Sequence, residues 1–281
     1  MLQGKKIGFL GAGSIAESLM RGLVAQAVVE PQAVMVTNRA NRERLDSLAK
    51  AYGVKGIPSK AELVPAADIL VIACKPKDVA ALLAEVAPYT RPGQILLSVA
   101  AGVATDVLAR ALGPDVQVVR AMPNTSCQVG ESATAICAGP GCGPEALAIC
   151  RTILGAVGRV VEVAEPLIDA VTGLSGSGPA YIYMLVEGMV EAGVSVGLPV
   201  EVARTLSVQT LMGAARMLLE TGEEPEQLRQ KVTSPGGTTM AGLSELQAAG
   251  FTQALVRAVT RATERSRELG ALALRSASVA N

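Results

Sequence analysis

Short apolar runs alternate with longer segments of helical period over the first 163 residues of the chain. Apolar runs bounded by glycine, proline or asparagine indicate buried strands, and apolar residues spaced three or four positions apart indicate amphipathic helices. The expected strands are residues 5–10, 33–37, 69–74, 95–99, 116–120, 132–137 and 159–163, and the expected helices are residues 14–27, 41–51, 77–87, 104–112 and 143–155. This alternation predicts a doubly wound, mostly parallel sheet with right-handed crossovers.

The pattern changes after residue 164, where strand patterns stop and helical periods continue. The expected helices are residues 166–173, 179–196, 199–220, 225–232, 239–248 and 252–269. The sequence therefore predicts an α/β domain over residues 1–164 and an all-α domain over residues 165–281. Apolar positions surround most of the 179–196 helix, and such a helix has to be buried. We expect the same domain of another subunit to cover it, which predicts an obligate dimer or a larger homo-oligomer.

Glycines follow the first strand in the pattern Gly11-x-Gly13-x-x-Ala16, immediately before the first helix. In a dinucleotide-binding turn, the first glycine permits the tight turn and the second lets the pyrophosphate approach the backbone. The third small residue lets the helix pack on the strand. Because the pattern lies between a strand and a helix, it predicts a dinucleotide site at the start of the chain.

The end of the second strand favours NADP(H) over NAD(H). An NAD site usually has Asp or Glu there to bind the ribose 2′-hydroxyl, whereas this chain has Asn38 and Arg39. A guanidinium can bind a 2′-phosphate through two hydrogen bonds. Arg42 and Arg44 follow one turn later, and they either assist Arg39 or form a solvated basic start to the next helix.

Small residues also follow later strands, in Ala73–Pro76, Ser98–Gly102 and Arg120–Thr125. Ligands of doubly wound sheets bind at the carboxyl ends of the strands, and small residues there allow a nicotinamide to approach closely. Lys75 and Asn124 are the polar side chains of interest. Each segment could equally be an ordinary strand-to-helix loop.

Residues 232–243 combine a helix-stopping Pro235 with Gly236, Gly237 and the pair Thr238-Thr239 that opens a new helix. Glycines allow backbone shapes that other residues avoid, and the first N–H groups of a helix have no partner within it. The segment therefore predicts an anion site suited to a carboxylate or a phosphate. The alternative is a plain corner between two helices.

Composition excludes several classes of protein. Lys and Arg total 25, as do Asp and Glu, so no net charge favours nucleic acid or an anionic membrane. No apolar run reaches the roughly 18 residues of a membrane span. The chain has no histidine, which excludes Ser-His-Asp and Cys-His catalysis and the zinc sites that use histidine. The five cysteines lack metal-ligand spacing, so we expect no metal, reduced thiols and a cytoplasmic protein.

Together these segments resemble the pyrroline-5-carboxylate reductases over essentially the whole chain. The most specific segments are Asp169–Tyr181 and Ser234–Thr239, and residues 8–13, 73–76 and 100–103 carry the resemblance in the first domain. It implies an N-terminal Rossmann domain and an all-α C-terminal domain that binds substrate and forms dimers, which some members assemble into decamers. It also implies NADPH- or NADH-dependent reduction of the cyclic imine 1-pyrroline-5-carboxylate to L-proline, the last step of proline biosynthesis.

The resemblance, taken with the residue patterns, assigns individual positions. The residues expected at the cofactor are Gly11, Ala12, Gly13, Ser14, Ile15, Asn38, Arg39, Ser59, Ala73, Lys75, Pro76, Ala100, Ala101 and Asn124. The residues expected at the substrate are Val232, Ser234, Gly236, Gly237, Thr238 and Thr239. The backbone N–H groups of Gly236, Gly237 and Thr239 would bind the substrate carboxylate. Thr239 matches the family's fixed threonine, whose hydroxyl orients the ring nitrogen and is a proposed proton donor.

Two positions depart from the family pattern. Ser126 stands where many members have proline, and Ser59 stands where some have asparagine near the cofactor. Two alternative functions also remain, an NADP-dependent dehydrogenase of hydroxy acids or other imines and a non-catalytic NADP-binding regulator. The absence of lysine from residues 179–196 counts against the hydroxy-acid enzymes. The intact Ser234–Thr239 segment counts against a regulator.

Overall fold

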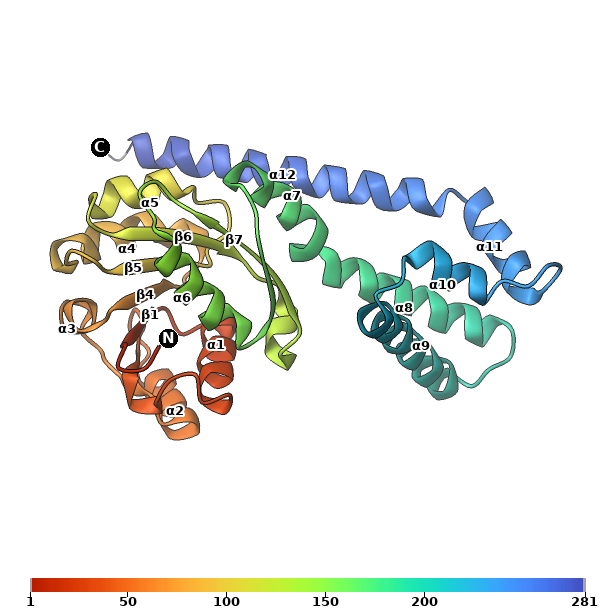
Figure 1. Cartoon of the computed structure of the whole chain (residues 1–281), viewed down its shortest axis with the longest axis horizontal. Helices are drawn as coiled ribbons and strands as arrows, with labels where there is room; N and C mark the ends of the chain where they lie inside the picture. The colour runs from red at the N-terminus through yellow and green to blue at the C-terminus, as the bar shows by residue number, and fades with distance from the viewer. Residues whose placement is uncertain (1, 280–281) are drawn as a thin grey trace. The chain divides into compact units, whose positions relative to one another are not determined.

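The structure is a computed structural model that describes the backbone of residues 2–279 and the side chains of residues 2–271. The chain forms two compact units (Figure 1). One holds the described residues up to Ser177 together with those from Arg261 onward, and the other is Gly178–Thr260. The first unit extends past residue 164, the predicted domain boundary, which stays a prediction.

The first unit is built on a sheet that contains eight strands within the described residues, in the order β3-β2-β1-β4-β5-β6-β7-β8. The strands are β1 (Ile7–Leu10), β2 (Val34–Thr37), β3 (Lys55–Gly56), β4 (Ile69–Ile72), β5 (Ile95–Ser98), β6 (Gln117–Met122), β7 (Ser132–Ala138) and β8 (Gly158–Glu162). The chain adds β2 and β3 on one side of β1 and β4 on the other, which makes the gap between β1 and β4 the switch point of the sheet. Ligands of doubly wound sheets bind at this point.

All neighbouring strands are parallel except β6 and β7. Their connection holds only residues 123–131, including the 3₁₀ helix η4 (Thr125–Val129). Parallel neighbours need a crossover of a dozen or more residues. The connection is too short for that, so β7 returns antiparallel to β6.

Helices cover both faces of the sheet. Up to Ser177, the α-helices of this unit are α1 (Ser14–Ala25), α2 (Arg42–Tyr52), α3 (Lys60–Ala66), α4 (Val79–Val86), α5 (Thr105–Leu112), α6 (Pro144–Gly155) and α7 (Ile168–Val171). The short helices are η1 (Pro31–Ala33), η2 (Pro76–Asp78), η3 (Ala87–Tyr89), η5 (Glu165–Leu167) and the π-helical turn η6 (Thr172–Gly176). Successive strand residues point to opposite faces. Phe9 accordingly lies in one hydrophobic cluster, with α1, α2 and α6, and Leu10 lies in a second, with α3, α4 and α5.

The predicted strands and helices between residues 5 and 163 are present, with ends that differ by at most two residues. The sequence pattern missed β3 and α3. β3 has two exposed residues, and α3 has seven residues with Pro65 inside. Neither is long enough to show a period. The predicted helix 166–173 is divided among η5, α7 and η6.

The second unit contains α8 (Gly178–Ser195), α9 (Val200–Thr221), α10 (Pro225–Lys231), α11 (Thr238–Ala248) and the start of α12 (Phe251–Val279). α8 packs on α9 where Gly193 meets Ala203, because a Cβ added at Gly193 would lie 2.9 Å from the Ala203 Cβ. Within Gly178–Thr260, all of it described, only Ala203 and Ser207 are buried. Many large apolar side chains are exposed there, among them Met184, Val196, Leu206, Met217 and Val256.

None of the helices in the described part of the chain is both long and apolar enough to cross a membrane.

Candidate active site

The glycine turn lies at the switch point, directly after β1. Gly11 has φ +123°, a conformation that side chains disfavour, and a Cβ there would lie 2.7 Å from the Ala73 carbonyl oxygen at the end of β4. The Gly11 N–H donates to the Thr37 carbonyl at the end of β2, at 3.0 Å. The predicted role of Gly11 in the tight turn therefore has a physical cause, since neighbouring strand ends leave no room for a side chain.

Gly13 is the N-cap of α1, with φ −79°, and a Cβ there would find only the Ala73 carbonyl oxygen, 3.8 Å away. The protein itself therefore does not require glycine at this position. The first N–H groups of α1, including those of Ser14 and Ile15, have no partner within the helix. Open space before unpaired N–H groups at a helix start fits the pyrophosphate of a dinucleotide. Ala16 is fully buried between helix and sheet, as the pattern predicts.

Asn38 shapes the loop after β2. Its side-chain amide donates to the Asn41 carbonyl at 2.6 Å and accepts from the Asn41 N–H at 2.9 Å. The Asn41 side chain in turn accepts from the Arg44 N–H and caps α2. The Asn38 amide thus bonds within the loop, and a contact with the cofactor stays a prediction for this residue.

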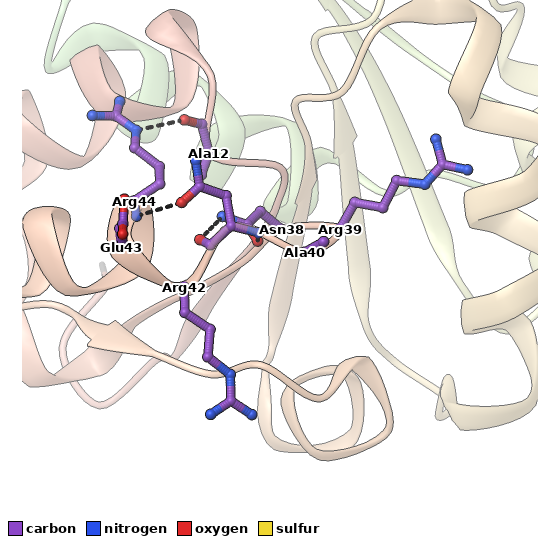
Figure 2. Close-up of a pocket in the computed structure, with 8 residues that line it drawn as sticks. Ala12, Asn38, Arg39, Ala40, Arg42, Glu43 and Arg44 are labelled. Carbon is purple, nitrogen blue, oxygen red and sulfur yellow. Dashed lines mark hydrogen bonds between the residues drawn. The ribbon is translucent and has the colours of Figure 1, made fainter.

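Arg39 and Arg42 line an open pocket of about 760 Å³ together with Ala12 and Asn38. Figure 2 shows both guanidinium groups extending away from the loop. Among the described residues, neither forms a hydrogen bond or an ion pair. Two unpaired guanidinium groups beside a dinucleotide turn suit a 2′-phosphate.

Arg44 differs from these two arginines, and its role could not be predicted from the residues around it. Its Nε donates to the Ala12 carbonyl at 3.1 Å, and its Nη2 donates to the Glu17 carboxylate (Figure 2 shows the Ala12 bond). The hydrogen bond from Arg44 is the main cause that holds the pKa of Glu17 below its ordinary value, opposed by partial burial. Arg44 therefore belongs to the framework of the turn.

The predicted loops after β4 and β5 lie at the same edge of the sheet. Lys75 is exposed and precedes η2, which begins at Pro76. The Val99 N–H donates to the Ile72 carbonyl at 3.0 Å, and Ala100 is buried whereas Ala101 is partly exposed. Ser59 is the N-cap of α3, and its loop is tied to the end of β2 by the Thr37 hydroxyl, which donates to the Pro58 carbonyl at 3.4 Å.

Asn124, predicted to contact the cofactor, is buried and bound to the protein. Its side-chain oxygen accepts from the Ser126 N–H at 3.1 Å, and its Nδ2 donates to the Ser175 carbonyl at 3.0 Å. These bonds give Asn124 a structural role in joining the β6–β7 connection to η6. A cofactor contact through the remaining amide hydrogen stays a prediction.

A polar network at the start of α5 was also missed. The Glu165 carboxylate accepts from the Thr105 N–H at 2.8 Å, from the Thr105 hydroxyl at 2.5 Å and from the buried Arg120 at 3.2 Å. Glu165 thus caps α5 from a distant part of the chain. Its spacing from Thr105 and Arg120 carries no local signal, so the sequence could not reveal it.

The five cysteines are free thiols. Burial is the first cause that raises the pKa of Cys137 to about 11 and also raises the pKa values of Cys74, Cys142 and Cys150. These four groups are therefore neutral at physiological pH and poor nucleophiles. Within the described residues, no group of Cys, Asp and Glu side chains is placed to hold a metal ion.

The predicted anion turn joins α10 and α11 in the second unit. Gly236 has φ +70°, and Gly237 is the N-cap of α11, which begins at Thr238. One expectation is wrong in detail, because the Gly237 N–H donates to the Ser234 carbonyl at 3.0 Å and is not free for a ligand. The N–H groups of Thr238 and Thr239 belong to the first turn of α11 and have no partner within the helix.

The side chains of the turn are accessible. Val232, Ser234, Thr238 and Thr239 are all exposed. In the part of the chain that the structure describes, neither threonine hydroxyl has a hydrogen-bond partner. The turn therefore presents unpaired N–H groups and two free hydroxyls, which suits a small ligand that carries a carboxylate.

A dinucleotide turn at the switch point of a doubly wound sheet, followed by a helical unit with an anion turn, defines the class of NAD(P)-dependent oxidoreductases with a separate helical domain. Comparison with known families is specific. Residues 6–102 match the family described as NADP oxidoreductase coenzyme F420-dependent, and residues 165–269 match the pyrroline-5-carboxylate reductase dimerisation family.

Individual relatives agree. Pyrroline-5-carboxylate reductase 1 of Bacillus spizizenii is 42% identical, over 94% of this chain and 89% of its own. A solved pyrroline-5-carboxylate reductase from Coxiella burnetii superposes with a TM-score of 0.90 at 36% identity, over 94% of this chain and 98% of that one. A Plasmodium falciparum pyrroline carboxylate reductase with NADP bound gives a TM-score of 0.84 at 28% identity, over 95% and 98%. The chain belongs to the pyrroline-5-carboxylate reductase family.

These findings confirm the predicted fold class, a Rossmann domain followed by a helical dimerisation region. They also confirm the prediction that the chain is an NADP-dependent oxidoreductase. The dimerisation family match indicates that the chain forms homo-oligomers, which agrees with the exposed apolar side chains of the second unit.

Proposed function

We propose that the protein reduces 1-pyrroline-5-carboxylate to L-proline with NADPH as the hydride donor, the last step of proline biosynthesis. The observation that carries the proposal is the Ser234–Thr239 turn, with Gly236 at φ +70° and an exposed Thr239 at the start of α11. It stands in a chain that is 42% identical to a pyrroline-5-carboxylate reductase over 94% of its length.

The Rossmann unit would hold the cofactor. The open space at Gly13 and the first N–H groups of α1 suit the pyrophosphate. Arg39 would bind the 2′-phosphate, with the equally unpaired Arg42 beside it. Ala73, Lys75, Pro76, Ala100 and Ala101 would lie near the nicotinamide. NADH, which lacks the 2′-phosphate, remains an alternative donor. NADPH, when bound, supplies the hydride.

The turn before α11 would hold the substrate. The N–H groups of Gly236, Thr238 and Thr239 would bind its carboxylate, and Val232 and Ser234 would flank it. The Thr239 hydroxyl would orient the ring nitrogen. A threonine hydroxyl is a weak acid, and the chain has no histidine, so the proton on nitrogen would come from water or arrive with the substrate. Positioning would supply most of the rate.

The oligomer would be a dimer formed by the C-terminal helices, which could further assemble into a decamer. Exposed apolar side chains such as Met184 and Val196 support a partner copy over the second unit. Sedimentation equilibrium measures the number of subunits, and a monomer at micromolar concentration would contradict the proposal.

A substrate profile tests the function. Purified protein should oxidise NADPH when 1-pyrroline-5-carboxylate is added, and should remain inactive with the keto acids that hydroxy-acid dehydrogenases reduce. The decrease in absorbance of NADPH reports the rate, and proline in the product mixture identifies the reaction. Turnover of keto acids without turnover of the imine would replace the proposal with a hydroxy-acid dehydrogenase.

A further inference from the structure

Arg44 is the one arginine of the open pocket whose guanidinium faces the glycine turn (Figure 2). We propose that Arg44 is a positioning residue that orients the Gly13 N–H toward the cofactor pyrophosphate, and that it does not bind the 2′-phosphate itself. The inference rests on the proposed cofactor site. In this proposal, Arg39 and Arg42 select the cofactor and Arg44 shapes the turn.

The contacts of Arg44 fix its place. Nε donates to the Ala12 carbonyl at 3.1 Å, and Nη2 donates to the Glu17 carboxylate. The other oxygen of Glu17 accepts from the Tyr52 hydroxyl at 3.0 Å. Arg44 lies near the start of α2 and Tyr52 is its last residue, so both ends of α2 are bonded to the same carboxylate in the first turns of α1.

Peptide geometry carries the effect from Arg44 to the ligand. The Ala12 carbonyl and the Gly13 N–H belong to one planar trans peptide unit, so they point in opposite directions. Arg44 holds the carbonyl toward α2 and thereby directs the Gly13 N–H away from it. The Gly11 N–H is already committed to the Thr37 carbonyl at 3.0 Å, which fixes the other side of the turn. The turn is thus set before a ligand arrives.

Arg44 is poorly placed to bind a phosphate as well. Its planar guanidinium has five N–H donors, and one edge of it already serves Ala12 and Glu17. Glu17 adds a negative charge next to it, which would repel a phosphate on that side. Arg39 and Arg42 have no partner among the described residues and remain available for the 2′-phosphate.

The two cofactors separate these roles, because NADPH and NADH share the pyrophosphate and differ in the 2′-phosphate. Loss of Arg44 should therefore weaken the binding of both cofactors by a similar factor. Loss of an arginine that binds the 2′-phosphate should weaken the binding of NADPH alone.

The test measures dissociation constants of NADPH and NADH for the full-length protein by isothermal titration calorimetry. Arg44→Ala, Glu17→Gln and their double variant should each weaken both cofactors by about three- to tenfold, as expected for the loss of one or two hydrogen bonds. The double variant should lose no more affinity for either cofactor than the weaker-binding single variant does, because both residues act through one contact network. It also leaves no unpaired carboxylate to repel NADPH selectively.

Two controls accompany these variants. Arg42→Ala should weaken the binding of NADPH and leave the binding of NADH unchanged. Arg110→Ala removes an arginine from an exposed ion pair with Asp106 on α5 and should change neither constant. Should Arg44→Ala fail to fold, Glu17→Gln keeps the arginine and still tests the network.

A selective loss of NADPH binding in the double variant would overturn the inference, as would unchanged binding of both cofactors. Both results would leave the proposed function standing. If the wild-type protein bound neither cofactor, the proposed function itself would fall, and this inference with it.

Discussion

Gly11 and Gly13 stand two residues apart in one turn, yet the structure gives them different reasons to be glycine. At Gly11 the protein demands it, since φ is +123° and a Cβ would lie 2.7 Å from the Ala73 carbonyl oxygen. At Gly13 the backbone is ordinary, and a Cβ would clear the Ala73 oxygen at 3.8 Å. The demand at Gly13 would come from the cofactor, which needs the backbone within reach.

Alanine at each glycine should separate stability from binding. Gly11→Ala should destabilise the fold by at least about 2 kcal/mol, because it adds backbone strain to a clash with the chain. Gly13→Ala should leave the melting temperature nearly unchanged but weaken NADPH binding by about tenfold or more, the cost of losing one hydrogen bond to a charged group. Thermal denaturation and NADPH titration measure the two effects. If a well-folded Gly13→Ala variant bound NADPH as tightly as the wild type, the pyrophosphate could not lie at this turn.

At the residue scale, the sequence predicted what local spacing can carry. The glycine turn, the basic end of β2 and the turn at Gly236 are all short patterns. The roles of Arg44 and Glu165 could not be predicted, because their partners lie far along the chain. The hydrogen bond of the Gly237 N–H was not predicted for another reason. The sequence does not specify which N–H group of a tight turn forms the hydrogen bond that closes the turn.

At the element scale, the start of α5 shows how the fold supports a loop of the site. The helix follows the Ala100–Ala101 segment proposed to lie near the nicotinamide, and its own N-cap, Ala104, offers no side-chain oxygen. Glu165 supplies the cap instead, through the Thr105 N–H and hydroxyl. The same carboxylate pairs with Arg120, whose side chain is only 8% exposed. One residue therefore joins β6, α5 and η5.

Removing this carboxylate should be costly. Glu165→Ala should lower the free energy of unfolding by about 2 to 3 kcal/mol, because it leaves a buried guanidinium unpaired and a helix uncapped. The loss should be smaller than for a fully buried pair, since Glu165 keeps 28% exposure. The matched control is Glu162→Ala, which breaks an exposed pair with Arg151 and should cost less than about 1 kcal/mol. Urea denaturation measures both, and equal losses would contradict the capping role.

The elements themselves were largely predictable, because apolar period and length identify long helices and buried strands. β3 and α3 were missed because each is too short to show a period. The antiparallel β7 depends on the length of its connection, and the predicted strands on either side do not reveal its direction.

At the scale of the whole molecule, the two units bury their apolar side chains to very different degrees. The sheet unit encloses two large hydrophobic clusters. In Gly178–Thr260, where every residue is described, only Ala203 and Ser207 are buried. The sequence predicted that the 179–196 helix needs a cover, and the match to a dimerisation family indicates what provides it. The number of subunits could not be predicted, because it depends on contacts between copies that one chain does not contain.

The decisive measurement for the proposed reductase is the rate of NADPH oxidation with 1-pyrroline-5-carboxylate, for wild type, Thr239→Ala and Thr239→Val. We predict turnover by the wild type. Both variants should lose about 10- to 100-fold in kcat, the effect of one hydrogen bond made in the transition state, with KM changed by less than about threefold. Thr239 is exposed and has no partner among the described residues, so neither change should disturb the fold. Wild-type activity that survives both substitutions would remove the Thr239 hydroxyl from the mechanism, and a wild type that binds NADPH but leaves the imine unreduced would contradict the reductase.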